Sequence, residues 1–344
     1  MSADELSTAG LILRYLLIGK VTRDFIISLD KKATNDIPAG PLLYCAAGLA
    51  LWDNGAGLVG KVGEDYPIDK LEAWSNYGFD LSGVIQISTP IDARRFFFYP
   101  GVDMVVRDNP LSHYSQVDAP LPKPLLGYTP EVPKVDSKNR LTAESITPKD
   151  IPPEYLDATF VHLCPLDYLS HFTLPTYLRQ KHATTITLHP SPSYFQPLFW
   201  EEIPGLVKDL TALHCSEEEI RGLFQGKTTD IWEMAETLAG YGVEYVTIYR
   251  QSRGQYLYHR ALNRRWTFPP YPSRILDPTG ELDAYCGGFL AGFRDTYDPV
   301  EAVVYGNISA SIKLEGIGPG YLIDTLPGLA KARCQTVRSG VRQV

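Results

Sequence analysis

The chain has 344 residues, 44% hydrophobic and 21% charged, which is an ordinary balance for a globular protein with a large core. Its net charge of −8 argues against a nucleic-acid partner, because binding to phosphate backbones needs a basic face. No apolar run approaches the ~18 residues that span a bilayer, and the first ten residues lack the basic and apolar parts of a signal peptide, so we expect a cytoplasmic protein without a membrane partner.

Strand-like apolar runs alternate with helical patterns along most of the chain. The expected strands are 11–18, 57–62, 159–163, 184–188 and 245–248, and the expected helices are 42–52, 217–224 and 231–240. This alternation is typical of a parallel sheet that is covered by helices on both faces. The length allows one large α/β domain with a small appendage, or two domains.

Two kinds of segment interrupt this alternation. Residues 25–29 and 94–99 are β-type runs that come too early and too close to other strands to fit the alternating order. Residues from about 110 to 153 are rich in proline, which opposes both helices and sheet ladders. We expect the second segment to be a long extended excursion that packs against these β-type runs or against a partner subunit.

The cysteines and histidines give little sign of metal binding. The five cysteines are scattered and odd in number, and no Cys-x-x-Cys occurs. The seven histidines also lack the spacing of metal ligands. We therefore expect buried free thiols and no structural metal.

Residues 55–60 match the dinucleotide-binding pattern Gly-x-Gly-x-x-Gly. That pattern works when a strand precedes the glycines and a helix follows them, so that the pyrophosphate meets a helix N-terminus. In this sequence the order is reversed, with a helical stretch before the glycines and a strand after them. We therefore do not expect a nicotinamide or flavin cofactor.

The most informative stretch is 277–290, in which a Thr279-Gly280 loop leads through Asp283 into an apolar helix. The first backbone N–H groups of a helix have no partner within the helix and suit an anion such as a phosphate. Asp283 would present a carboxylate at the same place, which could accept a proton from a substrate. The simpler alternative is a helix-capping aspartate without a chemical role.

The same stretch resembles the C-terminal signature of the ribokinase-like (PfkB-type) sugar kinases, Asp-Thr-x-Gly-Ala-Gly-Asp-x-Phe-x-x-Gly. Residues 57–65 are similar to the N-terminal signature of that family, and residues 16–24 are similar to its first strand and substrate-binding aspartate. Residues 306–311 resemble the late helix beside the adenine. The matches follow the order of the family and span roughly residues 12 to 318.

The resemblance implies a single domain, 1–344, with a three-layer α/β/α sandwich, a mostly parallel central sheet and a small β lid. The lid would comprise segments at about 24–42 and 88–108, and the proline-rich insertion would follow at about 110–153. Lid strands with exposed edges often pair between subunits, so a homodimer through the lid is a further expectation.

The implied activity is ATP-dependent phosphorylation of a hydroxyl on a sugar, nucleoside or related small alcohol. Asp283 would be the general base, and the turn of Thr279, Gly280, Glu281 and Leu282 would hold the phosphate. The predicted contacts with the small-molecule substrate are Asp24, Gly40 and Tyr44. The predicted nucleotide contacts are Ser216 and Asn307, and Glu219 is assigned to Mg²⁺ through water, with a solvated acid of a first helical turn as the alternative.

Several positions depart from the family pattern. The Gly-Ala-Gly-Asp of the family is here Gly280-Glu-Leu-Asp283, so Glu281 brings a negative charge to the place where a phosphate should arrive. At ~5 Å and an effective dielectric constant of ~20, that repulsion is about 3 kcal/mol unless the side chain turns into water. Tyr44 also stands where the family has a sugar-binding asparagine. These departures keep a second function open, a catalytically impaired protein that binds a metabolite or nucleotide as a sensor or interaction partner.

Overall fold

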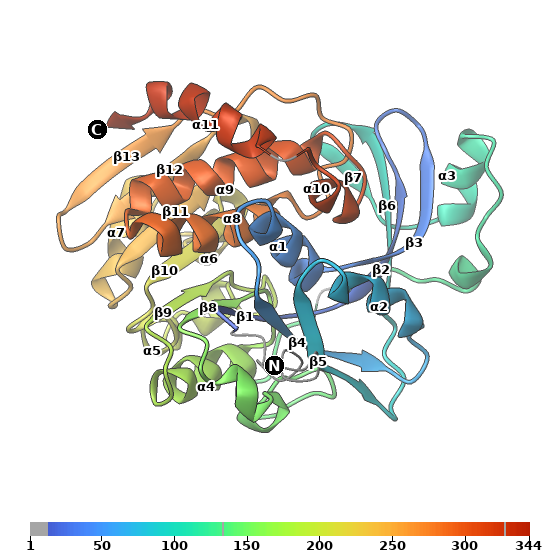
Figure 1. Cartoon of the computed structure of the whole chain (residues 1–344), viewed down its shortest axis with the longest axis horizontal. Helices are drawn as coiled ribbons and strands as arrows, with labels where there is room; N and C mark the ends of the chain where they lie inside the picture. The colour runs from blue at the N-terminus through green and yellow to red at the C-terminus, as the bar shows by residue number, and fades with distance from the viewer. Residues whose placement is uncertain (1–12, 133, 327) are drawn as a thin grey trace, which may run out of the picture.

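The computed structural model describes residues 13–132, 134–326 and 328–344, and within them the main sheet has ten strands (Figure 1). In spatial order these are β14 (Arg342–Gln343), β13 (Arg264–Phe268), β12 (Gln255–His259), β11 (Tyr245–Tyr249), β10 (Ala212–Ser216), β9 (Thr185–Leu188), β8 (Phe160–Leu163), β1 (Tyr15–Ile18), β4 (Ala56–Gly63) and β5 (Phe79–Ile87). Neighbouring strands are parallel from β5 to β11 and antiparallel from β11 to β14.

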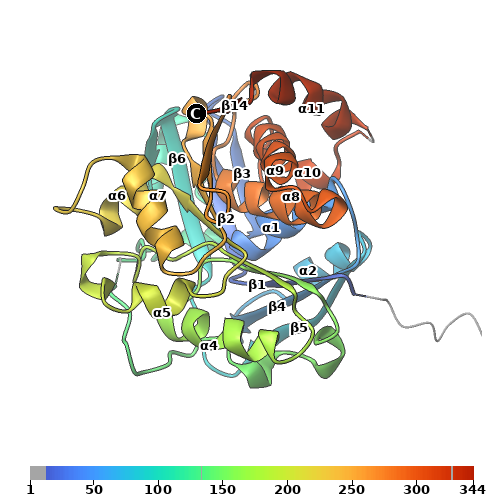
Figure 2. The same cartoon turned by 90° about the vertical axis from the view of Figure 1, so that its left-hand side faces the viewer.

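Helices cover both faces of this sheet, as Figure 2 shows. On one face lie α1 (Pro41–Ala50), α2 (Asp69–Ser75), α8 (Glu281–Thr296), α9 (Pro299–Leu314), α10 (Gly320–Ile323) and α11 (Leu329–Gly340). On the other lie α4 (Tyr168–Arg179), α5 (Ile203–Val207), α6 (Glu217–Leu223) and α7 (Ile231–Gly240). Each face has its own apolar core, so the predicted three-layer α/β/α architecture is confirmed. None of the described helices is long and apolar enough to cross a membrane.

Local sequence explains where the main elements begin. β1 is buried at all four positions, as expected for a central parallel strand that is covered on both sides. The Asp230 side chain accepts hydrogen bonds from the first free N–H groups of α7, and Asp298 caps α9 in the same way just before Pro299. The glycine run at 55–60 enters and forms β4 instead of a loop before a helix, so it has no dinucleotide-binding geometry.

Close packing of α8 against α1 fixes the position of the stretch at 277–290. A side chain at Gly48 on α1 would place its Cβ 2.1 Å from the carbonyl oxygen of Ala284. A side chain at Gly287 on α8 would place its Cβ 1.9 Å from the carbonyl oxygen of Cys45. Both distances are far below a van der Waals contact, so the two helices approach this closely only because these positions are glycine.

A second sheet of four strands lies beside the main one, on the right-hand side of Figure 1. Its order is β3 (Ala33–Ala39), β2 (Thr22–Ile27), β6 (Arg94–Gly101) and β7 (Met104–Val106). β2 and β6 are parallel, whereas β3 and β7 pair antiparallel with them at the two edges. This small sheet falls in the segments assigned to the lid, and we refer to it as the lid sheet.

The proline-rich segment covers one face of the lid sheet. Its Tyr114 and Leu125 pack against Phe25 and Phe96 of the lid in a small apolar core of their own. The segment contains the helix α3 (Pro110–Gln116) and three 3-10 turns in and just after it, η2 (Lys123–Leu125), η3 (Pro148–Asp150) and η4 (Pro153–Tyr155). The expectation of a wholly extended segment was therefore wrong at α3, because a proline in the first helical turn, here Pro110, lacks only an N–H that has no helical partner anyway. Two other 3-10 turns are η5 (Pro197–Phe199) and η6 (Gln251–Arg253).

Candidate active site

The turn before α8 has a shape that only glycine permits at its last position. Gly280 is the residue preceding α8 and has a φ of 74°, in the left-handed region. A Cβ there would lie 2.2 Å from Cγ of Tyr44, whose ring is buried beneath the turn. Within the described chain, no backbone carbonyl accepts from the N–H groups of Gly280, Leu282 or Asp283. A helix start with free N–H groups at a tightly supported turn can bind an anion.

Asp283 lies in the first turn of α8 and faces a histidine that follows β9. His189 Nδ1 is 3.1 Å from Asp283 Oδ1, and His189 Nε2 is 3.3 Å from Glu219 Oε1. His189 and Glu219 follow the carboxyl ends of the neighbouring strands β9 and β10, the usual location of sites in open α/β sheets, and α8 brings Asp283 to the same edge. We call His189, Glu219 and Asp283 the edge cluster. Asp283 is therefore not simply a capping residue.

The edge cluster carries two negative charges around one positive charge. Burial alone would lower the pKa of His189, but the charge of Glu219 and the hydrogen bonds to Asp283 and Glu219 outweigh it and raise that pKa to about 10. The same contacts, with the Ser216 bonds, outweigh burial and lower the pKa of Glu219. At neutral pH the imidazole is thus protonated and keeps Glu219 ionised, and its other nitrogen faces Asp283.

Glu281 and Leu282, which depart from the family pattern, are both turned away from the free N–H groups. Glu281 is partly buried and accepts a hydrogen bond of 3.2 Å from the hydroxyl of Tyr249. Burial raises the pKa of Glu281 to about 7, against the lowering effects of that bond and of Lys313. Leu282 packs against the core on the α1 side of the sheet. The sequence left two alternatives for Glu281, a full charge at the phosphate or a side chain in water. The structure shows neither, because the carboxyl is partly buried and only partly ionised at neutral pH.

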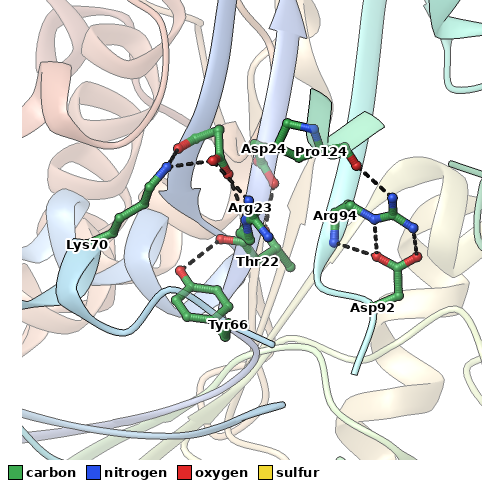
Figure 3. A network of polar contacts seen from close by, with 9 residues as sticks. Thr22, Arg23, Asp24, Tyr66, Lys70, Asp92, Arg94 and Pro124 are labelled. Carbon is green, nitrogen blue, oxygen red and sulfur yellow. Dashed lines mark hydrogen bonds and ion pairs between the residues drawn. The ribbon is translucent and has the colours of Figure 1, made fainter. Parts of the chain in front are cut away.

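The carboxylate of Asp24 is fully buried and fully occupied. It accepts a 2.6 Å hydrogen bond from Thr22, shown in Figure 3, and two from Arg95 at 3.0 and 3.1 Å. The Tyr44 hydroxyl lies 3.5 Å away on the other oxygen. The Arg95 side chain remains 31% exposed, so the arginine and not the aspartate is open to a ligand. The charge of Asp24, and more weakly that of Asp283, raises the pKa of Arg95 against the effect of burial.

Neighbouring ion pairs hold this part of the lid sheet in place (Figure 3). Arg23 and Lys70 both bind the carboxylate of Asp36, which links β2 and β3 to α2. Arg94 forms a two-pronged ion pair with Asp92 and donates to the carbonyl oxygen of Pro124 in the proline-rich segment. The lid sheet is therefore anchored to the main domain on one side and to the proline-rich segment on the other.

The structure has two pockets of interest, and only the first of them includes residues of the turn. The α9 pocket, of about 240 Å³, is lined by residues of the turn and of α9, among them Pro278, Glu281, Asn307, Ser311 and Leu314. The lid pocket, of about 370 Å³, lies between the end of β1, the lid sheet and the proline-rich segment, and its walls include Lys20, Thr22, Arg95, Glu131 and Glu144. The proline-rich segment thus supplies a wall of the lid pocket.

The structure brings together most of the residues predicted for the site. Thr279, Gly280 and Tyr44 form or support the turn, and Glu219 meets Asp283 through His189. Asn307 lines the α9 pocket, but its amide is used within the wall, in bonds to Gln255, Tyr271 and Pro269. The Ser216 hydroxyl caps α6 by accepting from Glu219 N, and Gly40 precedes α1 with a φ of 101°.

His189 and Arg95 each stand out in the sequence as a residue that could contact a phosphate or an acidic substrate, with a satisfied strand-end histidine and a solvated strand face as the simpler alternatives, but the sequence gives neither residue its partners and does not reveal one buried group. His189 and Arg95 depend on pairings between distant segments, of which the β2–β6 register that places Asp24 beside Arg95 is one. Deeper in the sheet, the ligand atoms of His162, His214 and Cys286 lie close enough together to share one metal ion. The ligand atoms of His162, Cys45 and Cys164 do so as well. All five cysteines are free and buried, as expected. The separate strands and helices that carry this group give no short spacing from which it could be recognised.

Comparison with known proteins agrees with the geometry. A model of the pfkB family of carbohydrate kinases matches residues 152–326. A cytidine kinase from Thermococcus kodakarensis is 28% identical over 288 residues, 82% of this chain and 89% of that protein. Adenosine kinase from Sinorhizobium meliloti has a similar structure, with a TM-score of 0.69 at 17% identity over 94% of this chain and 99% of the other. For ribokinase from Thermotoga maritima the TM-score is 0.64 at 17% identity, over 94% and 99%. The ribokinase-like fold is confirmed.

Proposed function

This chain belongs to the pfkB family of carbohydrate kinases, and from that premise we propose that it transfers a phosphoryl group from ATP to a hydroxyl of a nucleoside or sugar. Asp283 takes the proton from that hydroxyl, and the N–H groups of the 280–283 turn hold the phosphate. The observation that carries the proposal is that free N–H groups at the start of α8 and the Asp283 side chain, which His189 contacts at 3.1 Å, lie in one helical turn. Phosphoryl transfer requires both an anion site and a proton acceptor.

The α9 pocket fits the nucleotide. It adjoins the turn through Pro278 and Glu281, so a base between its walls would extend its phosphates toward the start of α8. Tyr271 and Leu314 offer apolar surface, and Ser311 and Gln255 offer polar atoms. Glu219, whose pKa is lowered by His189 and the Ser216 bonds against burial, supplies an ionised oxygen suited to the water shell of Mg²⁺. Magnesium would neutralise charge on the phosphates.

The lid pocket fits the acceptor. Arg95 reaches it from β6, next to Thr22 and the end of β1. Because Asp24 already binds Arg95 through two nitrogens, the remaining guanidinium N–H groups can donate to carbonyl or hydroxyl oxygens of a substrate. A pyrimidine nucleoside carries both kinds of oxygen, and a relative that matches 82% of this chain is a cytidine kinase. Cytidine is therefore the first acceptor to test, with adenosine and ribose after it.

The test is turnover with a panel of nucleosides and sugars, measured as ADP release with Mg·ATP. We expect one acceptor class to give turnover and Asp283→Asn to lower kcat by about 10³-fold, since positioned bases contribute roughly 10²–10⁴. The Asp283→Asn protein should bind Mg·ATP about as well as the native one, because the turn keeps its N–H groups. Turnover that survives Asp283→Asn would remove Asp283 as the base.

The second candidate is a binding protein without turnover. It is favoured by the ion pair between Asp283 and His189, since a carboxylate that stays in that pair is a weak proton acceptor. In that case Mg·ATP or a nucleoside should raise the melting temperature, as any ligand of the native state does, while no acceptor releases ADP. Ligand-induced stabilisation without ADP release would decide for this alternative.

A further inference from the structure

Lys313, near the end of α9, is completely buried together with Asp277, and neither side chain exposes any surface. Its ammonium group donates to Asp277 Oδ2 at 2.9 Å, to the carbonyl oxygen of Asp277 at 2.9 Å and to the carbonyl oxygen of Gly316 at 3.1 Å. Three acceptors therefore receive its three protons. Lysine is almost never fully buried unless it is paired in this way.

The other end of the ion pair shapes the turn before α8. Asp277 Oδ1 accepts from the N–H of Thr279 at 2.9 Å, and Asp277 Oδ2 accepts from the N–H of Gly318 at 3.1 Å. The Thr279 hydroxyl lies 2.8 Å from that of Tyr99 on the lid strand β6. One buried pair thus joins the turn, the loop after α9 and, through Thr279, the lid sheet.

Lys313 also reaches the ring that supports Gly280. Its Nζ lies 5.4 Å from the centroid of the Tyr44 ring, within the range of a cation–π contact. That ring is the surface against which Gly280 is packed. Asp277 and Tyr44, the two groups that determine the shape of the turn, are both in contact with the same ammonium.

We propose that Lys313 is a positioning residue for the phosphate turn: through Asp277 and the Tyr44 ring, its ammonium fixes the 277–280 backbone in the shape that receives an anion. The proposal rests on the proposed function, in which the turn receives a phosphate.

A purely structural role does not account for this arrangement. A buried ion pair is often no more stabilising than apolar residues of the same volume, so stability alone gives little reason for one. A pair placed directly behind an anion-binding turn supplies charge and geometry that apolar residues cannot. The lysine here is built into the chain, so its charge is present at the turn without a bound cation.

The experiment compares the native protein with Lys313→Met and with the double variant Asp277→Asn/Lys313→Met. The single variant leaves Asp277 without its partner and can fail to fold. The double variant removes both charges and keeps an oxygen acceptor for Thr279 N–H. Glu236→Gln/Arg265→Met is the matched control, because it removes an ion pair between α7 and β13, away from the turn.

We expect the double variant to melt near the native temperature but to bind pyrophosphate and Mg·ATP about tenfold more weakly, a difference of about 1.4 kcal/mol. Amide hydrogen exchange at Thr279, Glu281 and Ala284, whose N–H groups are hydrogen-bonded in and beside the turn, should become faster by a similar factor. The control should change neither property. Native-like pyrophosphate affinity together with native-like exchange in the double variant would overturn the proposal.

Charge rescue provides a second readout that a merely structural lysine would not give. In Lys313→Ala the space left by the side chain should admit ammonium or methylammonium but not tetramethylammonium. At equal ionic strength, the two small cations should restore pyrophosphate binding and slow the exchange at Thr279, Glu281 and Ala284, and restoration by all three or by none would contradict the proposal. If the native protein binds neither pyrophosphate nor Mg·ATP, the proposed function fails, while exchange at the turn still decides the role of Lys313.

Discussion

Two clusters that contain buried histidines differ in charge although both are almost completely shielded from water. In the edge cluster each nitrogen of His189 faces a carboxylate. In the second group, which we call the mid-sheet layer, His162 and His214 each bond a threonine hydroxyl through Nδ1, at 2.8 Å to Thr187 and 2.6 Å to Thr247. Within the described chain their Nε2 atoms have no hydrogen-bond partner.

The partners, not the depth of burial, decide the charge. Burial lowers the pKa of His214 to about 3 and that of His162 well below its usual value, because a threonine hydroxyl does not compensate an imidazolium. For His189 two carboxylates outweigh burial and bring the pKa to about 10. The histidines of the mid-sheet layer are thus neutral and serve as packed core residues. The edge cluster is charged and lies where functional sites of this fold class lie.

The largest effect should come from removing the charge of the edge cluster while keeping its hydrogen bonds. His189→Gln can still donate to a carboxylate but carries no charge, so Glu219 loses the charge that lowers its pKa and Asp283 loses its positive neighbour. We expect kcat to fall by about 10²-fold, the scale of a lost acid–base group. A native kcat would show that the charge of His189 is not needed for turnover.

Much of the fold follows from the sequence because its signals are local. The helix expected at 231–240 coincides with α7, and the strand expected at 57–62 lies within β4 at Ala56–Gly63. The turn before α8 was also predictable, because a Thr-Gly loop and an acid at the start of a helix occur within a few residues. Residues 11 and 12 of the first expected strand lie outside the described residues.

The rest of the site depends on pairings over long distances. In the sequence, Glu219 is 30 positions and Asp283 is 94 positions from His189, so no short pattern connects the three residues. Asp24 was expected to bind substrate, but the parallel register of β2 and β6 places Arg95 on its carboxylate. The side-chain direction of Glu281 was likewise decided by Tyr249, on a strand far away in the sequence.

The second-largest effect should be on the pH dependence of stability, in which the mid-sheet layer and the edge cluster act in opposite directions. An unfolded histidine titrates near pH 6.5, whereas His214 stays neutral in the folded protein until about pH 3. Between these values the unfolded chain binds more protons, so the free energy of unfolding falls with decreasing pH, by at most about 1.4 kcal/mol per pH unit for each such histidine. His189 acts in the opposite direction, since its stabilisation is complete below about pH 6.5 and is lost as pH rises toward 10.

His214→Leu should therefore flatten the loss of stability between pH 6 and 4, measured by urea unfolding, with little change at pH 7. His182→Gln is the control, because His182 is exposed. A loss of several kcal/mol at pH 7, or the loss of a bound metal ion measured by mass spectrometry, would show instead that the mid-sheet layer holds a ligand between His162, His214 and Cys286.

The smallest effect concerns Glu281, which lies near the edge cluster but has a hydroxyl partner like the mid-sheet histidines. Because burial raises its pKa to about 7, Glu281 is mostly neutral at pH 6 and mostly charged at pH 8. A charged carboxylate beside the turn repels phosphate, so pyrophosphate affinity should weaken about tenfold over this range relative to Glu281→Gln. Taking the ratio to that variant cancels the titration of pyrophosphate itself. Tyr249→Phe should move the transition to higher pH, since the hydroxyl bond stabilises the charged form. A constant ratio would mean that Glu281 keeps a fixed charge between pH 6 and 8. The Tyr249 hydroxyl would then fix the charge of Glu281, as Asp283 and Glu219 fix the charge of His189.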